Sequence, residues 1–134
     1  MADITRITAP SLATSTPCHA SLVDQGGSKV AGEDITAGMA CYIKASDAKV
    51  YRANGTAANE AARAWGIAAR TCKIGEPITL YRDVEFEYGA AMAIGTPLYV
   101  SVTAGALADA ASVGGLTKVA HVVSATRIRF KGDL

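Results

Sequence analysis

Two histidines and three cysteines are the residues of this chain best suited to bind a metal. They are His19, His121, Cys18, Cys41 and Cys72. Zinc sites usually draw on short motifs such as Cys-x-x-Cys or His-x-x-x-His, and neither spacing occurs. The adjacent pair of Cys18 and His19 can supply only part of a site. We therefore expect no metal and no cofactor, and we interpret the cysteines as buried structural thiols in a reducing cytosol.

Three carboxylates, Asp83, Glu85 and Glu87, could act as acid and base in catalysis. They alternate with the apolar residues Val84 and Phe86, which is the pattern of a β-strand with one polar and one buried face. The sequence contains neither a Gly-x-Ser-x-Gly motif nor a phosphate-binding glycine loop. We expect no catalytic residues, and the carboxylates to mark a solvated or interfacial face.

Three cations, Arg127, Arg129 and Lys131, alternate with apolar residues near the end of the chain. Such a stripe could contact nucleic acid, but Phe130 points to the opposite face and offers no stacking platform beside it. The net charge of +1 also creates no strong field for an anionic partner. We expect no nucleic-acid partner, and a solvated or subunit-facing edge instead.

The composition indicates a single domain of 134 residues with a thin core. Half of the residues are apolar, but the chain has only two Phe and one Trp. No apolar run approaches the roughly 20 residues of a membrane helix. Residues 1–6 lack the basic start and apolar stretch of a secretory signal. We therefore expect no membrane partner and synthesis in the cytoplasm.

A short motif that begins with glycine recurs along the chain and predicts turns that directly precede strands. It reads Gly75-Glu76-Pro77-Ile78 in one copy and Gly95-Thr96-Pro97-Leu98 in another, with a looser copy over 31–38. Glycine adopts backbone angles that other residues resist, and proline fixes φ as a strand begins. The chain is therefore expected to consist of short strands joined by tight turns.

The predicted fold is all-β, a small β-barrel or β-sandwich with one short helix. We expect eight or nine strands, because turn residues recur at the spacing typical of such folds. Predicted strands cover 18–23, 39–44, 49–53, 67–72, 78–88, 97–102, 118–124 and 126–130, and the second and third form a hairpin. Alanine-rich residues 56–65 predict a helix of two to three turns, with Trp65 docking it onto a sheet.

Residues 1–17 predict an extended N-terminal arm, followed by one β-rich domain over 18–134. Pro10 and Pro17 disfavour a helix in the arm. An ordered arm needs a surface to lie on, such as a neighbouring subunit, and the alternative is a frayed terminus.

The order of these parts resembles a known protein family. The segments are 31–43, 49–53, Trp65-Gly66-Ile67-Ala68, Gly75-Glu76-Pro77-Ile78, 94–99 and 127–130. Together they are similar to the small capsid decoration, or cement, proteins of tailed bacteriophages. The resemblance implies a homotrimer on the outer surface of the phage head, where major capsid subunits meet. It further implies a structural role, stabilising the capsid against internal DNA pressure, with no catalytic residues.

For such a role we predict interface residues from their type. The candidates are Tyr42, Trp65, Tyr99, Met92, Arg127 and Arg129. Aromatic residues, Met and Arg are enriched in interface cores, and the alternative for each is packing within the chain.

Two other functions stay open. One is a different virion β-module, such as a tail or fibre subunit. The other is a small carrier domain, because Asp47-Ala48-Lys49-Val50 at a hairpin tip resembles the modified lysine of lipoyl or biotinyl domains. The order Asp-Ala-Lys differs from the carrier order Asp-Lys-Ala, which argues against this second reading.

Overall fold

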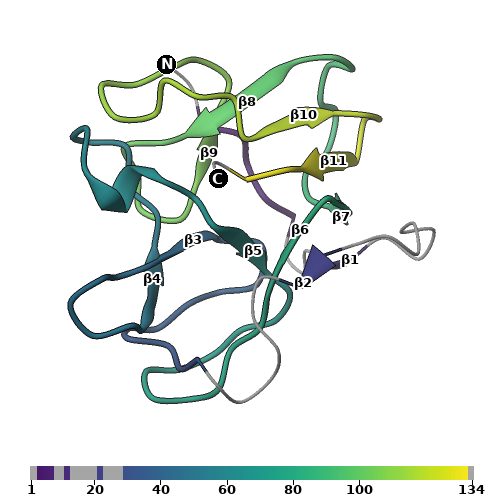
Figure 1. The fold of residues 1–134 in the computed structure, drawn as a ribbon. Helices are drawn as coiled ribbons and strands as arrows, with labels where there is room; N and C mark the ends of the chain where they lie inside the picture. The colour runs from purple at the N-terminus through teal and green to yellow at the C-terminus, as the bar shows by residue number, and fades with distance from the viewer. Residues whose placement is uncertain (1–2, 8–10, 13–20, 23–28, 133–134) are drawn as a thin grey trace.

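Antiparallel β-strands make up most of the part of the chain that the structure describes. The structure is a computed structural model that describes residues 3–7, 11–12, 21–22 and 29–132. Its strands form two sheets, one above the other in the view of Figure 1. The predicted all-β fold is confirmed, and the sheets form an open sandwich that does not close into a barrel. No helix among these residues is long and apolar enough to cross a membrane.

The six-stranded sheet contains most of the C-terminal half of the chain. Its order is β1-β7-β11-β10-β8-β9. The strands are β1 (Ser11–Leu12), β7 (Val84–Glu87), β8 (Pro97–Val100), β9 (Leu107–Ala108), β10 (Ala120–Val122) and β11 (Arg127–Phe130). The two-residue strands β1 and β9 escaped prediction, because so short a segment carries no alternation.

The five-stranded sheet has the order β2-β6-β5-β3-β4. Its strands are β2 (Ser21–Leu22), β3 (Ala40–Ile43), β4 (Val50–Arg52), β5 (Gly66–Ala68) and β6 (Leu80–Arg82). β3 and β4 form the predicted hairpin, with Tyr42 opposite Tyr51.

The glycine motif forms the same turn at its two close copies, whereas Gly32 of the looser copy has no positive φ and its amide donates to the Val50 carbonyl. In the turn over 73–76, the Glu76 amide donates to the Lys73 carbonyl (3.0 Å). Gly75, the third residue of this turn, has a φ of 86°. Only the third residue has a positive φ, which is the pattern of a type II turn. The turns at 93–96, 36–39 and 103–106 share the bond and the positive-φ glycine. One local structure therefore precedes β3, β6, β8 and β9.

Asp83 divides what the sequence presents as one strand. The alternation over 78–88 predicted a continuous strand, and this was wrong. Asp83 has a φ of 57°, a conformation that Asp tolerates better than most residues. The bend passes the chain from β6 in one sheet to β7 in the other. The apolar alternation of Ile78 and Leu80 is interrupted only at Arg82 and resumes at Val84, so the residue pattern did not reveal the bend at Asp83.

Two apolar cores lie on the two faces of the five-stranded sheet. Ala40 and Ile67 belong to the first core, which they share with the six-stranded sheet. Their chain neighbours Cys41 and Ala68 belong to the second core, which the segments around 31–39 and 72–78 cover. Because both faces are buried, these strands are continuous apolar runs instead of alternating ones.

The predicted helix over 56–65 is a single 3-10 turn, η1 (Glu60–Ala62). Asn59, and not Thr56, is the N-cap, and its side chain accepts from the Ala61 amide (3.1 Å). Upstream, the Asn54 side chain accepts from the Thr56 amide (2.8 Å) and holds the chain in a bend. Alanine favours a helix, but so short a helix needs an apolar face to pack, and only Ala62 of this turn is buried.

The described part of the N-terminal arm lies on the chain's own sheets. The Ile4 amide donates to the Leu107 carbonyl (2.9 Å), and Ile4 packs against the first core. The Asp3 carboxylate accepts from the hydroxyl of buried Ser101. For residues 3–7, the chain itself therefore supplies the surface that an ordered arm needs. Pro10, Pro17 and the boundary at 17/18 lie outside the described residues.

Candidate interaction surfaces

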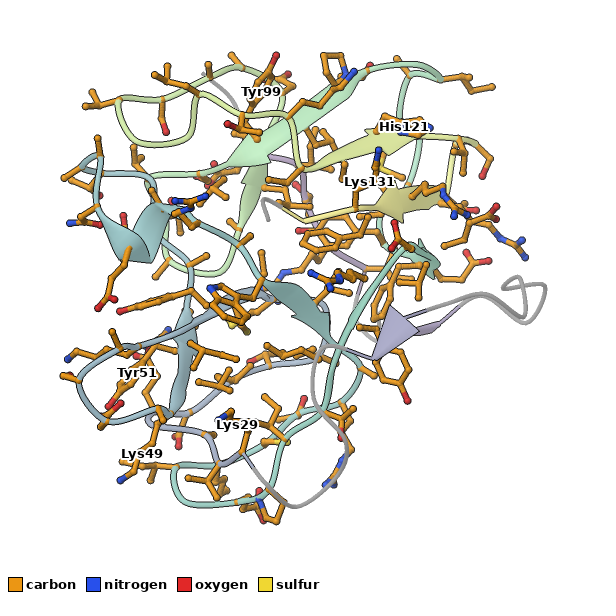
Figure 2. All side chains as sticks on the ribbon, in the orientation of Figure 1. Lys29, Lys49, Tyr51, Tyr99, His121 and Lys131 are labelled. Atoms are coloured by element: carbon orange, nitrogen blue, oxygen red, sulfur yellow. The ribbon has the colours of Figure 1, made fainter. Side chains whose placement is uncertain are left out.

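The six predicted interface residues lie in different parts of the molecule. Tyr42 is on β3, Trp65 precedes β5, Met92 precedes β8, Tyr99 is on β8, and Arg127 and Arg129 are on β11. Tyr99 lies toward the end of the molecule opposite Lys49 and Tyr51 of the β3–β4 hairpin (Figure 2). The strands that carry four of the six residues, β3, β8 and β11, belong to both sheets.

Tyr42 packs inside the β3–β4 hairpin and is 9% exposed. Its ring is tilted against that of Tyr51, with centroids 6.1 Å apart. Tyr51 is more exposed, and its hydroxyl donates to Asp47 Oδ2 (2.6 Å). The Lys44 ammonium lies 5.1 Å from the centre of the Tyr51 ring. The aromatic surface of this hairpin is thus Tyr51, which the sequence did not distinguish from the other tyrosines.

The predicted basic stripe is a surface of mixed charge. Arg127 Nε donates to Glu87 Oε1 (2.6 Å), and its Nη1 lies 3.8 Å from Glu85 Oε1. Arg129 lies opposite Glu85 in the register of β7 and β11. The carboxylates that suggested catalysis therefore balance the cations of the neighbouring strand, and Arg127 has partners within its own chain.

Met92 and Tyr99 are partly buried. Met92 packs against the first core, and a Cβ atom placed at Gly89 would lie 2.9 Å from Met92 Sδ. This contact favours intramolecular packing for Met92. Tyr99 is half-buried on β8, opposite Ala108 of β9.

Three exposed aliphatic side chains form what we call the aliphatic patch: Val102, Val113 and Leu116. Their exposed fractions are 44%, 71% and 70%. Hydrogen bonds join the loops that carry them: Gly114 N–H donates to Gly55 O (2.9 Å), and Thr56 Oγ1 donates to Val102 O (3.4 Å). Because these hydrogen bonds hold the loops together, we treat the exposed apolar side chains on them as a candidate interaction site.

Sequence reasoning gave these loops no interaction role: Val102 was placed at the end of the strand over 97–102, and residues 56–59 were placed in the helix. The available signal was the absence of charge: segments 53–59, 101–108 and 110–117 contain no Asp, Glu, Lys or Arg. Asp, Glu, Lys and Arg are among the residues that most often lie on a solvated surface. An uncharged turn with exposed Val or Leu could therefore have indicated a contact surface.

An open hollow of about 530 Å³ lies beside η1, between this turn and the β3–β4 hairpin. We call it the Trp65 hollow. Its apolar lining includes Ile43, Ala48 and Trp65, and its charged lining is Lys44, Glu60 and Arg63. Glu60 and Arg63 also line a second hollow with Leu116 on the other side of η1, so the Trp65 hollow adjoins the aliphatic patch.

The described cysteines are buried, as predicted for structural thiols. Cys41 and Cys72 are free thiols in the second core. Burial raises the pKa of the Cys41 thiol, and the Glu33 carboxylate raises it further. No group of three potential metal ligands occurs among the described residues. Cys18 and His19 lie outside them.

We expect Cys41 to resist alkylation in the folded protein. The thiolate is the reactive form, and a raised pKa keeps Cys41 protonated at pH 8. Iodoacetamide at this pH should leave Cys41 unmodified until urea unfolds the chain, as measured by peptide mass spectrometry. Modification at the same rate with and without urea would contradict this burial.

No protein-family model, curated protein or solved structure matches the chain.

Proposed function

We propose that this protein is a structural subunit of a tailed-phage virion. It binds the outer surface of the head as a homotrimer and stabilises the lattice of the major capsid protein. The resemblance of the ordered sequence segments to decoration proteins motivates this proposal. The observation that carries it is the aliphatic patch on a scaffold of two β-sheets, because a structural subunit acts through its contact surfaces.

The aliphatic patch supports self-association in particular. In a symmetric contact, residues near the axis meet copies of themselves, so like charges there would repel. The loops of the patch carry no charge, which makes the patch compatible with its own copy. We therefore assign the subunit contact of the trimer to Val102, Val113 and Leu116.

The affinity of the trimer for the capsid then increases with the number of contacts that it makes. A trimer presents three identical contacts at once, so modest individual affinities combine into tight attachment. The experiment that tests the function is the titration of undecorated heads with the purified protein. We expect saturable attachment, with cryo-electron microscopy locating the protein outside the head where capsid subunits meet. Density at the tail would favour a tail or fibre subunit, and no attachment would overturn the proposal.

The double variant Val113→Asp with Leu116→Asp should convert the trimer to a monomer. Two carboxylates in the patch would meet their copies across the contact, while both side chains are too exposed to affect folding. Sedimentation velocity measures the change in mass. The matched control is the double variant Ile74→Asp with Ile94→Asp, which places the same two charges on exposed aliphatic residues outside the patch and should leave the trimer intact. A double variant that stays trimeric would exclude the patch as the subunit contact.

A further inference from the structure

The Trp65 hollow is built before any partner arrives. Glu60 Oε2 accepts from the Ala45 amide (3.2 Å), which ties η1 to the β3–β4 hairpin. The Trp65 amide donates to the Cys41 carbonyl (2.7 Å), which ties the other wall to β3. Little ordering is needed on binding, and a preformed surface retains more of its contact energy as affinity.

The floor of the hollow is apolar and partly open to solvent. Trp65 and Ile43 pack against the second core with part of their surface, and the rest remains accessible. Among the described residues, none accepts a hydrogen bond from the Trp65 indole. Trp, together with Tyr and Arg, is enriched among the residues that dominate the energy of protein contacts.

The charges around the floor favour a negative group. The Glu60 carboxylate is engaged with the hairpin backbone. Arg63 is exposed, and no ion pair involves it within the described part of the chain. Lys44 lies over the Tyr51 ring, and the nearby Asp47 accepts hydrogen bonds from Tyr51 and the Lys49 amide. The guanidinium of Arg63 is therefore the cation most available to a partner.

From this geometry we infer that the Trp65 hollow is the capsid-binding site. It receives a segment of the major capsid protein in which an apolar side chain lies next to an Asp or Glu. The apolar side chain covers Trp65 and Ile43, and the carboxylate pairs with Arg63. This inference rests on the proposed function. When a second copy of the chain binds at the aliphatic patch, the Trp65 hollow lies beside the subunit contact. The trimer then presents three such hollows to the capsid.

The first test compares variants for attachment to undecorated heads by co-sedimentation. Arg63→Glu should weaken attachment at least about tenfold, because charge reversal places two carboxylates together. Its matched control is Arg70→Glu, an exposed arginine outside the hollow, which should bind like the unaltered protein. Trp65→Ala should weaken attachment to a similar extent. Since Trp65 also supports the second core, its unfolding midpoint is measured alongside, and Arg63→Glu keeps the test valid if Trp65→Ala unfolds.

The second test uses the only tryptophan of the chain as a reporter. Incorporating 5-hydroxytryptophan at this position allows excitation at wavelengths that ordinary capsid tryptophans do not absorb. Attachment should shift its emission and protect it from acrylamide. If the protein attaches without a change in 5-hydroxytryptophan emission, and Arg63→Glu attaches with unchanged affinity, the Trp65 hollow is not the capsid-binding site. The proposed function would still stand in that case. Absence of any attachment would overturn both.

Discussion

Replacing Phe130 by alanine should lower the free energy of unfolding by about 3–5 kcal/mol. Phe130 is fully buried on β11, in the first core that joins the two sheets. The substitution removes the ring and leaves a cavity that neighbouring strands can only partly fill. Small domains are stable by about 5–15 kcal/mol, so a loss of this size is a large fraction of the total. Urea denaturation followed by circular dichroism measures the change.

The neighbouring residue supplies the control. Lys131 is exposed, and Lys131→Ala should change stability by less than about 0.5 kcal/mol. A loss of less than about 1 kcal/mol for Phe130→Ala would show that the first core does not hold the sheets together as described.

Gly114→Ala should lower the free energy of unfolding by about 2–3 kcal/mol, because the loops of the aliphatic patch leave no room for a methyl group. A Cβ atom there would lie 2.1 Å from the Ala57 carbonyl oxygen and 2.9 Å from Ala62 Cβ. The loop must shift and weaken the hydrogen bond from Gly114 to Gly55. Hydrogen exchange of residues 54–58 and 112–116 should rise with the loss of stability.

Thr117→Ala is the control for this variant, since Thr117 is an exposed residue of the same loop. It should change stability and exchange little. Equal exchange in Gly114→Ala and the unaltered protein would contradict the close approach of the two loops.

Features that depend on neighbouring residues in the chain could be predicted from the sequence. The β3–β4 hairpin and the turns at Gly75 and Gly95 follow from local residue preferences, and the structure has them at the predicted positions. The helix over 56–65 was wrong because alanine content alone does not provide the packing that stabilises so short a helix. The division of 78–88 was missed, because the apolar alternation resumes at Val84 and a single arginine, Arg82, is the one interruption beside the left-handed Asp83.

The candidate surfaces were only partly predictable, since they depend on contacts between distant segments. Trp65 was a candidate by residue type alone, but its hollow requires η1 and the hairpin to lie side by side. Arg127 looked like a free cation until the register placed Glu87 opposite it. The aliphatic patch combines loops some 50 residues apart in the chain, as the bond from Thr56 to Val102 illustrates.

The single-residue crossing at Asp83 has a mechanical consequence. β6 and β7 belong to different sheets, yet only one residue separates them along the backbone. Tension applied to one sheet is therefore transmitted to the other through covalent bonds, with no slack linker to stretch first. A subunit built this way should deform as one stiff block and rupture in a single step when pulled. Such behaviour would suit a clamp on a shell that is pushed outward from within.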